Sequence, residues 1–140
     1  MPPLRVLLVD DSPADRFLAQ EVFATHGLDV HLTTSDSGEA ALDSMHRHHG
    51  HLPEVLLLDL NMPGMSGLDV LSEMKRDPEL AHIPVVMFTT SQAKTDVDAA
   101  YRLQACAYLV KSPNFGVFLQ QVESFITFWR CNRFPFAPQP

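Results

Sequence analysis

The hydrophobic residues of the chain fall into five short runs, separated by longer stretches in which apolar residues recur every three or four positions. An apolar run without alternation is typical of a strand that helices cover on both faces of a parallel sheet. The second run is more polar, which places it at an edge of the sheet. The predicted strands are Leu4–Val9, Val30–Thr34, Val55–Leu58, Ile83–Phe88 and Tyr108–Val110.

Helices are predicted after each strand, and several have clear start and stop signals. Ser12 followed by Pro13 is typical of an N-cap and a first helical residue, and Gly27 ends that helix. Ser37 and Asn114 start the second and fifth helices. The residues expected to face inward are Leu18, Ala19, Val22 and Phe23; Ala40, Ala41 and Met45; Leu68, Val70, Leu71 and Met74; Val97, Ala100, Tyr101 and Leu103; and Phe115, Phe118, Leu119, Val122, Phe125 and Ile126.

Five strands alternating with five helices predict an α/β fold with a doubly wound, five-stranded parallel sheet. Because crossovers are right-handed, we expect the flavodoxin-like strand order 2-1-3-4-5. This order places the first and third strands side by side at the switch point, where ligands bind in such sheets. The chain of 140 residues shows no repeat or interdomain linker. We expect one domain over residues 1–128 and a short C-terminal extension over 129–140.

Polar residues follow four of the predicted strands directly. Asp10 and Asp11 follow the first strand, and Asp59 follows the third. Thr89 follows the fourth strand, and Lys111 follows the fifth. Because the carboxyl ends of parallel strands meet at one edge of a sheet, we expect these side chains to lie together. Three carboxylates, one hydroxyl and one ammonium suit Mg²⁺ and a phosphoryl group.

The carboxylates are suited to binding Mg²⁺, which prefers oxygen ligands and keeps several waters. Asp11 and Asp59 can each give one oxygen, Asp10 can act through a metal-bound water, and the backbone carbonyl of Asn61 can complete the set. Carboxylates packed this closely repel one another when no cation is present. The sequence therefore predicts a bound divalent cation.

Asp59 is the best candidate nucleophile, since a carboxylate can attack phosphorus to form an aspartyl-phosphate. The charge of the transferring group is spread over its equatorial oxygens. Mg²⁺, the Lys111 ammonium and the Thr89 hydroxyl can each stabilise one of them. No general base is evident, so rapid hydrolysis is not predicted, and we expect a phosphoacceptor rather than an enzyme.

The composition narrows the function further. A net charge of −7 disfavours nonspecific nucleic-acid binding. The apolar runs are much shorter than the roughly 20 residues that cross a membrane, and no signal peptide precedes the first strand, so we expect a cytoplasmic protein. Two cysteines, Cys106 and Cys131, fit a reduced compartment. Cys106 is expected to be buried.

A set of short motifs lies in fixed order at the predicted strand ends. They are Val9-Asp10-Asp11, Leu58-Asp59-Leu60-Asn61-Met62-Pro63, Gly64 with Gly67, Thr89-Thr90, and Tyr108 three residues before Lys111. Together they resemble the CheY-like receiver domain of two-component response regulators. The resemblance implies that Asp59 accepts phosphate from a sensor histidine kinase and that Asp10 and Asp11 hold Mg²⁺. It also implies that Thr89 and Tyr108 are coupled switch residues.

Three further segments, Ser12-Pro13-Ala14-Asp15, Asp77-Pro78-Glu79-Leu80 and Phe128-Trp129, look like those of phytochrome-associated single-domain regulators. The wider likeness covers most of the chain. The likeness to phytochrome-associated regulators implies a bacterial phytochrome as the kinase. Because no output domain follows, we expect the output to be a contact with an unknown downstream protein, or a step in a relay.

One position departs from the receiver pattern. Receivers usually have proline directly after the active-site lysine, whereas Ser112 separates Lys111 from Pro113 here. A non-proline cis bond costs about 2.5–4 kcal/mol. The sequence leaves open whether the Lys111–Ser112 bond is cis or trans.

Aromatic residues are unusually dense after the fifth predicted helix, at Phe128, Trp129, Phe134 and Phe136. Such residues are enriched at protein interfaces. We therefore expect a homodimer formed by this helix and the tail, with Trp129 near the centre of the contact. The alternative is that Phe128 and Trp129 complete the core of the helix.

Other interpretations concern the histidines and the function as a whole. The histidines at 46, 48, 49 and 51 are favourable near a helix C-terminus and do not need a metal. A haloacid-dehalogenase-like phosphatase uses similar residues, but its nucleophile comes first, in an Asp-x-Asp motif, whereas Asn61 stands two residues after Asp59 here. A phosphorylation-independent scaffold is the third alternative.

Overall fold

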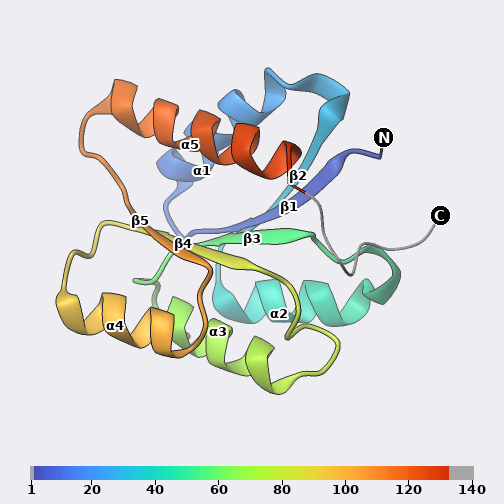
Figure 1. Ribbon diagram of the computed structural model, residues 1–140, viewed down its shortest axis with the longest axis vertical. Coiled ribbons are helices and arrows are strands. Elements are labelled where there is room, and N and C mark those ends of the chain that lie inside the picture. Colours follow the sequence, from blue (N-terminus) through green and yellow to red (C-terminus); the bar gives the residue numbers. More distant parts are fainter. Residues whose placement is uncertain (1, 133–140) are drawn as a thin grey trace.

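The computed structural model describes residues 2–132 and contains one five-stranded parallel sheet between two layers of helices (Figure 1). The strand order is β2-β1-β3-β4-β5, which confirms the predicted doubly wound fold. The strands are β1 (Leu4–Val9), β2 (Val30–Ser35), β3 (Val55–Leu58), β4 (Val85–Thr89) and β5 (Ala107–Val110). The helices are α1 (Pro13–Ala24), α2 (Gly38–Arg47), α3 (Gly67–Arg76), α4 (Lys94–Arg102) and α5 (Phe115–Arg130), with 3₁₀ turns at Gly27–Asp29 and His49–His51.

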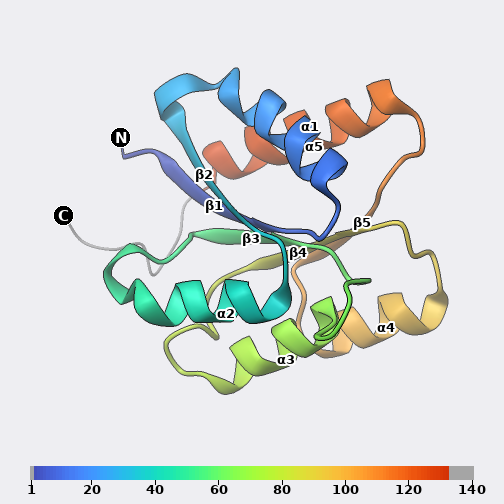
Figure 2. The same ribbon diagram turned by 180° about the vertical axis from the view of Figure 1, so that it is seen from behind.

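The two faces of the sheet are covered by different helices. Figures 1 and 2 show α1 and α5 on one face and α2, α3 and α4 on the other. Side chains alternate along each central strand, so Leu56 enters the core under α2–α4 and Leu57 enters the core under α1 and α5. Burying each such leucine contributes about 1.5–3 kcal/mol. The two cores together fix the strand ends, where the polar residues lie.

The predicted helix starts at Ser12, Ser37 and Asn114 are confirmed, and Ser66 provides a fourth N-cap. Each of these side chains accepts a hydrogen bond from the backbone N–H three residues later. The first helix ends at Ala24 with Thr25 as its C-cap, before the predicted end at Gly27. Gly27 has a left-handed φ of 59° and opens the 3₁₀ turn that follows.

Three residues predicted to face inward are exposed. In α2, Gly38, Ala41 and Met45 form the buried face, so Ala40 points to solvent. Tyr101 in α4 is half-exposed because the preceding residue faces the core. Phe115, in the first turn of α5, is also exposed and lines a groove beside α1.

The C-terminal helix continues past the predicted domain boundary at residue 128, because α5 ends at Arg130. Trp129 is buried and packs on Phe125 with ring centroids 6.2 Å apart, so it completes the core of its own chain. Phe128 is 60% exposed and lies edge-on to Trp129. Phe134 and Phe136 lie outside the described residues. The division into domain and extension stays a prediction, and the buried Trp129 favours placing it after Arg130.

None of the helices within residues 2–132 is long and apolar enough to span a membrane.

Candidate functional site

The pairing of β1 with β3 brings the first and third strand ends together. Val9 is aligned with Leu58, and the N–H of Asp59 donates to the carbonyl of Val9 at 2.9 Å. Asp10 and Asp59 therefore follow neighbouring strands directly, and both are buried, with exposures of 1% and 7%. The predicted convergence of these carboxylates at the carboxyl edge of the sheet is confirmed.

Asp10, Asp11 and Asp59 form the acidic cluster of the site. Each offers one carboxylate oxygen, and these atoms all lie within 4.8 Å of one another. Oxygen ligands at this spacing fit a hard divalent cation. Among the described residues, this is the one such group of carboxylate, imidazole or thiol ligands. Asn61 follows in the exposed loop after β3, and its role as a carbonyl ligand stays a prediction.

Lys111 brings a buried positive charge to the cluster. Its Nζ donates to Asp10 at 2.6 Å and to Asp15 at 2.8 Å, and it lies 3.6 Å from Asp59 Oδ2. Burial alone would lower the pKa of Lys111, but the two hydrogen bonds and the charges of Asp10 and Asp59 outweigh it and raise the pKa. The lysine is therefore a permanent ammonium in this site.

The environment of Asp59 makes its carboxyl group harder to ionise than that of an aspartate in water. Burial raises the pKa of Asp59, and the nearby charge of Asp10 raises it further. The charge of Lys111 and the hydroxyl of Thr89 lower the pKa but do not offset these effects. A cation bound to the cluster would favour the ionised form and lower this pKa.

Thr89 is fully buried at the end of β4, and its carbonyl accepts from the N–H of Lys111 at 2.8 Å. Its Oγ1 accepts from the N–H of Ser91 at 3.4 Å. The hydroxyl of Tyr108 donates to the carbonyl of Ser91 at 3.0 Å. The two predicted switch residues thus contact the same short loop, while Thr90 is exposed.

The loop after Lys111 is held without a cis bond, since every peptide bond among the described residues is trans. The N–H of Ser112 donates to Gln121 Oε1 at 3.0 Å, and Gln121 Nε2 donates to the carbonyl of Val110 at 2.7 Å. This pair of hydrogen bonds anchors the loop on α5. The question left open by the sequence is thereby answered as trans.

Two residues of the site were not predicted from the sequence. Asp15 pairs with Lys111, and Arg16 donates from its Nη1 to the carbonyl of Asp10 at 2.7 Å. Both stand in the first turn of α1, directly behind the strand end. An acidic residue in the first turn of a helix is usually explained by the helix dipole alone. Its position in the sequence therefore does not indicate that it belongs to the site.

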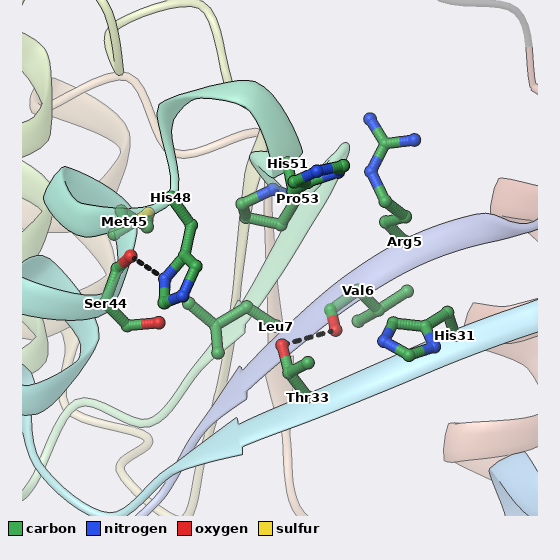
Figure 3. A pocket seen from close by; sticks show the side chains of 10 residues that line it. All are labelled: Arg5, Val6, Leu7, His31, Thr33, Ser44, Met45, His48, His51 and Pro53. Atoms are coloured by element: carbon green, nitrogen blue, oxygen red, sulfur yellow. Dashed lines mark hydrogen bonds between the residues drawn. The ribbon is translucent and has the colours of Figure 1, made fainter.

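Three of the histidines near the end of α2 have protein partners. His46 bonds to Asp77, His48 bonds to the carbonyl of Ser44, and His49 pairs with Glu79. A cavity of about 350 Å³ lies near them. Figure 3 shows the side chains of His31, His48 and His51 among the residues that line it. The interpretation of these histidines without a metal stays a prediction.

Cys106 is exposed, contrary to the prediction that it is buried. It lies just before β5, where its N–H donates to the carbonyl of Val85. Because β5 is the edge strand, no further strand lies beyond this position on that side of the sheet.

Comparison with known proteins gives a consistent result. Response regulator Rcp1 from Synechocystis sp. is 40% identical over 132 residues, which cover 91% of this chain and 90% of Rcp1. The crystal structure of the phosphorylated cyanobacterial phytochrome response regulator RcpA superposes with a TM-score of 0.90 at 33% identity, covering 95% of this chain and 99% of RcpA. The structure of the Mn²⁺-bound form of Rcp1 superposes with a TM-score of 0.88 at 38% identity, with the same coverage. Residues 6–123 match the response regulator receiver domain, and the chain belongs to this family.

Proposed function

We propose that Asp59 accepts a phosphoryl group from the phosphohistidine of a sensor kinase, in a Mg²⁺-dependent reaction. One observation carries this proposal: the buried Asp59 carboxylate lies within 4.8 Å of the Asp10 and Asp11 ligand oxygens and 3.6 Å from the Lys111 ammonium. This arrangement pairs a nucleophile with a site for a divalent cation and with a fixed positive charge.

Asp10, Asp11 and Asp59 would hold Mg²⁺, with the carbonyl of Asn61 as a further ligand. When bound, Mg²⁺ supplies positive charge to the phosphoryl oxygens and keeps Asp59 ionised. The choice of Mg²⁺ over other divalent cations rests on its preference for carboxylate and carbonyl oxygens.

The chain's own residues then account for the transfer. An oxygen of ionised Asp59 attacks phosphorus as the phosphorus–nitrogen bond to the donor histidine breaks, and the imidazole keeps the bonding electron pair. The Lys111 ammonium and the Thr89 hydroxyl stabilise the charge on the phosphoryl oxygens. No proton has to leave Asp59 during this step, because the attacking group is already a carboxylate.

Signalling would follow from the loop that Thr89 and Tyr108 share. A phosphoryl oxygen on Asp59 accepts from the Thr89 hydroxyl and draws it toward the phosphate, and this displacement lengthens the hydrogen bond that Thr89 Oγ1 accepts from the N–H of Ser91. Movement of Ser91 in turn changes the acceptor of the Tyr108 hydroxyl. The two switch residues thereby shift the population between two packings of the β4–α4 loop.

The test is intact mass spectrometry after incubation with Mg²⁺ and acetyl phosphate. We expect one added phosphate on the wild-type protein and none on Asp59→Asn or in the presence of a chelator. Asp43→Asn, on the exposed face of α2, serves as the control and should match the wild type. Phosphate on Asp59→Asn would refute the assignment, and an unphosphorylated wild type would favour the scaffold alternative.

We infer that the kinase is of the phytochrome type, because Rcp1 and RcpA are both similar to this chain and RcpA is a phytochrome response regulator. Transfer from a labelled bacterial phytochrome kinase should be faster than transfer from a chemotaxis kinase. Equal rates would contradict the proposal of a phytochrome-type kinase. We also propose a cytoplasmic protein without substrate turnover or nucleic-acid binding, acting on a downstream protein.

We propose that a second copy of the chain covers the groove between β5 and α5. This groove measures about 520 Å³ and is lined by Leu109, Phe125, Phe128 and Trp129. Phe128 is the exposed anchor, whereas Trp129 lies at the groove floor. A twofold contact would bury Phe128 from both copies.

Light scattering tests this assembly. Phe128→Asp should convert a dimer into a monomer, and Phe17→Asp is the matched control because Phe17 is equally exposed, at 58% against 60%, on α1. A wild-type monomer at high micromolar concentration would refute the dimer. Truncation after Asn132, which keeps the buried Trp129, tests whether Phe134 and Phe136 add to the contact.

A further inference from the structure

Two helices of the chain begin with the same motif but use it differently. In α3, Ser66 Oγ accepts from the N–H of Asp69, and Asp69 Oδ2 accepts in return from the N–H of Ser66 at 3.1 Å, which closes a capping box. In α1, Ser12 Oγ accepts from the N–H of Asp15, but the N–H of Ser12 donates to Asp10 Oδ1 at 2.9 Å instead. The carboxylate of Asp15 is therefore not used for capping.

This carboxylate binds the ammonium of Lys111 instead. The Asp15–Lys111 distance is 2.8 Å, against 3.6 Å between Lys111 and Asp59. The side chain of Lys111 is 5% exposed and that of Asp15 is 29% exposed, so the pair joins the buried site to its solvent-facing rim. We call the place of the ammonium between Asp10 and Asp15 its resting position.

We propose that Asp15 is a positioning residue that keeps the Lys111 ammonium in its resting position, so that Asp59 retains free oxygens for a divalent cation. An ammonium has three N–H donors. Without Asp15, a donor that is now satisfied turns toward Asp59, which is the nearest other carboxylate. It then competes with the cation for Asp59. This inference rests on the proposed function of the site.

The first experiment measures Mg²⁺ binding by isothermal titration calorimetry. Asp15→Asn should raise the dissociation constant about twofold to fivefold, a modest factor because the pair is partly exposed and screened. Asp69→Asn changes the same motif position in α3 and should leave Mg²⁺ affinity unchanged. Unchanged or tighter Mg²⁺ binding by Asp15→Asn would overturn the proposal.

The second experiment separates an effect through Lys111 from a simple loss of negative charge. Calorimetry on Lys111→Met, with and without Asp15→Asn, completes a double-mutant cycle. If Asp15 acts through the ammonium, Asp15→Asn should alter Mg²⁺ affinity much less in the Lys111→Met background. The same factor in both backgrounds would show that Asp15 acts only as a distant charge, which refutes its positioning role.

The third experiment follows phosphorylation by acetyl phosphate across a range of Mg²⁺ concentrations. The Mg²⁺ concentration for half-maximal rate should rise in Asp15→Asn by the factor seen in calorimetry, while the rate at saturating Mg²⁺ should not fall. A fall in the saturating rate would overturn the proposal. An unphosphorylated wild type would refute the proposed function, and calorimetry would still decide the role of Asp15.

Discussion

Replacing Asp59 with asparagine should stabilise the cation-free protein, although the substitution abolishes the proposed phosphoacceptor. Asp59 is buried beside two other carboxylates, and burial raises its pKa. Its charge is therefore unfavourable in the folded state. Asparagine has the same shape and removes that charge.

The magnitude follows from the distances in the site. The ligand oxygens of Asp10 and Asp59 lie within 4.8 Å of each other, and at an effective dielectric constant of about 20 two charges at that limit repel by about 3.5 kcal/mol. The Lys111 ammonium at 3.6 Å attracts it by about 4.6 kcal/mol. This attraction and the repulsion from Asp10 largely offset each other, so burial of the charge, the largest effect on Asp59, decides the sign. The expected gain in the free energy of unfolding for Asp59→Asn is on the order of 2 kcal/mol.

The gain depends on pH with a definite sign. Because the pKa of folded Asp59 lies above its ordinary value of 3.8, the folded state holds the proton more tightly than the unfolded state does. Ionised Asp59 therefore destabilises the folded wild type at neutral pH. This penalty is lost as pH falls through the folded pKa and is absent below 3.8. The advantage of Asp59→Asn should be largest at neutral pH and should vanish in acid.

Urea unfolding at neutral and acidic pH, followed by the fluorescence of Trp129, measures the effect in a chelator. Mg²⁺ at ten times its dissociation constant should stabilise the wild type by about 1.4 kcal/mol and Asp59→Asn much less. Asp43→Asn, which removes an exposed ion pair, should lose only a few tenths of a kcal/mol. The reasoning fails if Asp59→Asn is no more stable than the wild type at neutral pH, or if its advantage persists in acid.

Gly67→Ala should lower the free energy of unfolding by about 1–3 kcal/mol and slow phosphorylation, because its Cβ would lie 2.1 Å from the carbonyl oxygen of Asp59. Gly50→Ala, with open space around its Cβ, is the control, and equal unfolding curves for the two variants would contradict this. Thr89→Ala should still accept phosphate but show a smaller phosphate-dependent change in amide exchange over α4, β5 and α5. Thr89→Ser, which keeps the hydroxyl, should behave as the wild type. A full response in Thr89→Ala would exclude a switching role for Thr89. Cys106 should react with a thiol reagent in the folded protein at a rate close to that in urea, and strong protection would contradict its exposure.

The fold and the centre of the site could be predicted because both depend on local patterns. Apolar runs mark the strands, and the residue directly after each run must lie at the carboxyl edge of the sheet. This rule alone placed three residues, Asp10, Asp59 and Thr89, at the carboxyl edge of the sheet. They are buried because neighbouring strands flank them. The strand order then needed only the handedness of the crossovers.

The remaining details depend on contacts between segments far apart in the chain. The pairing of Asp15 with Lys111 joins residues 96 positions apart, and the motif around Asp15 is the same as that of a simple helix cap. The exposure of Cys106 follows from the place of β5 at the sheet edge. The pattern of apolar residues does not indicate that this strand lies at the edge. Trp129 was expected at an interface because aromatic density alone does not distinguish a core from a surface.

The positions of the exposed aromatic rings have an evolutionary consequence. Phe17, Phe115 and Phe128 project from the outer surfaces of α1 and α5, whereas the acidic cluster and Lys111 sit at the ends of strands. Duplicated copies of such a gene could diverge at these rings and acquire new partners while the phosphoacceptor chemistry stays intact. Substitutions on the outer surfaces of α1 and α5 can therefore separate parallel signalling pathways.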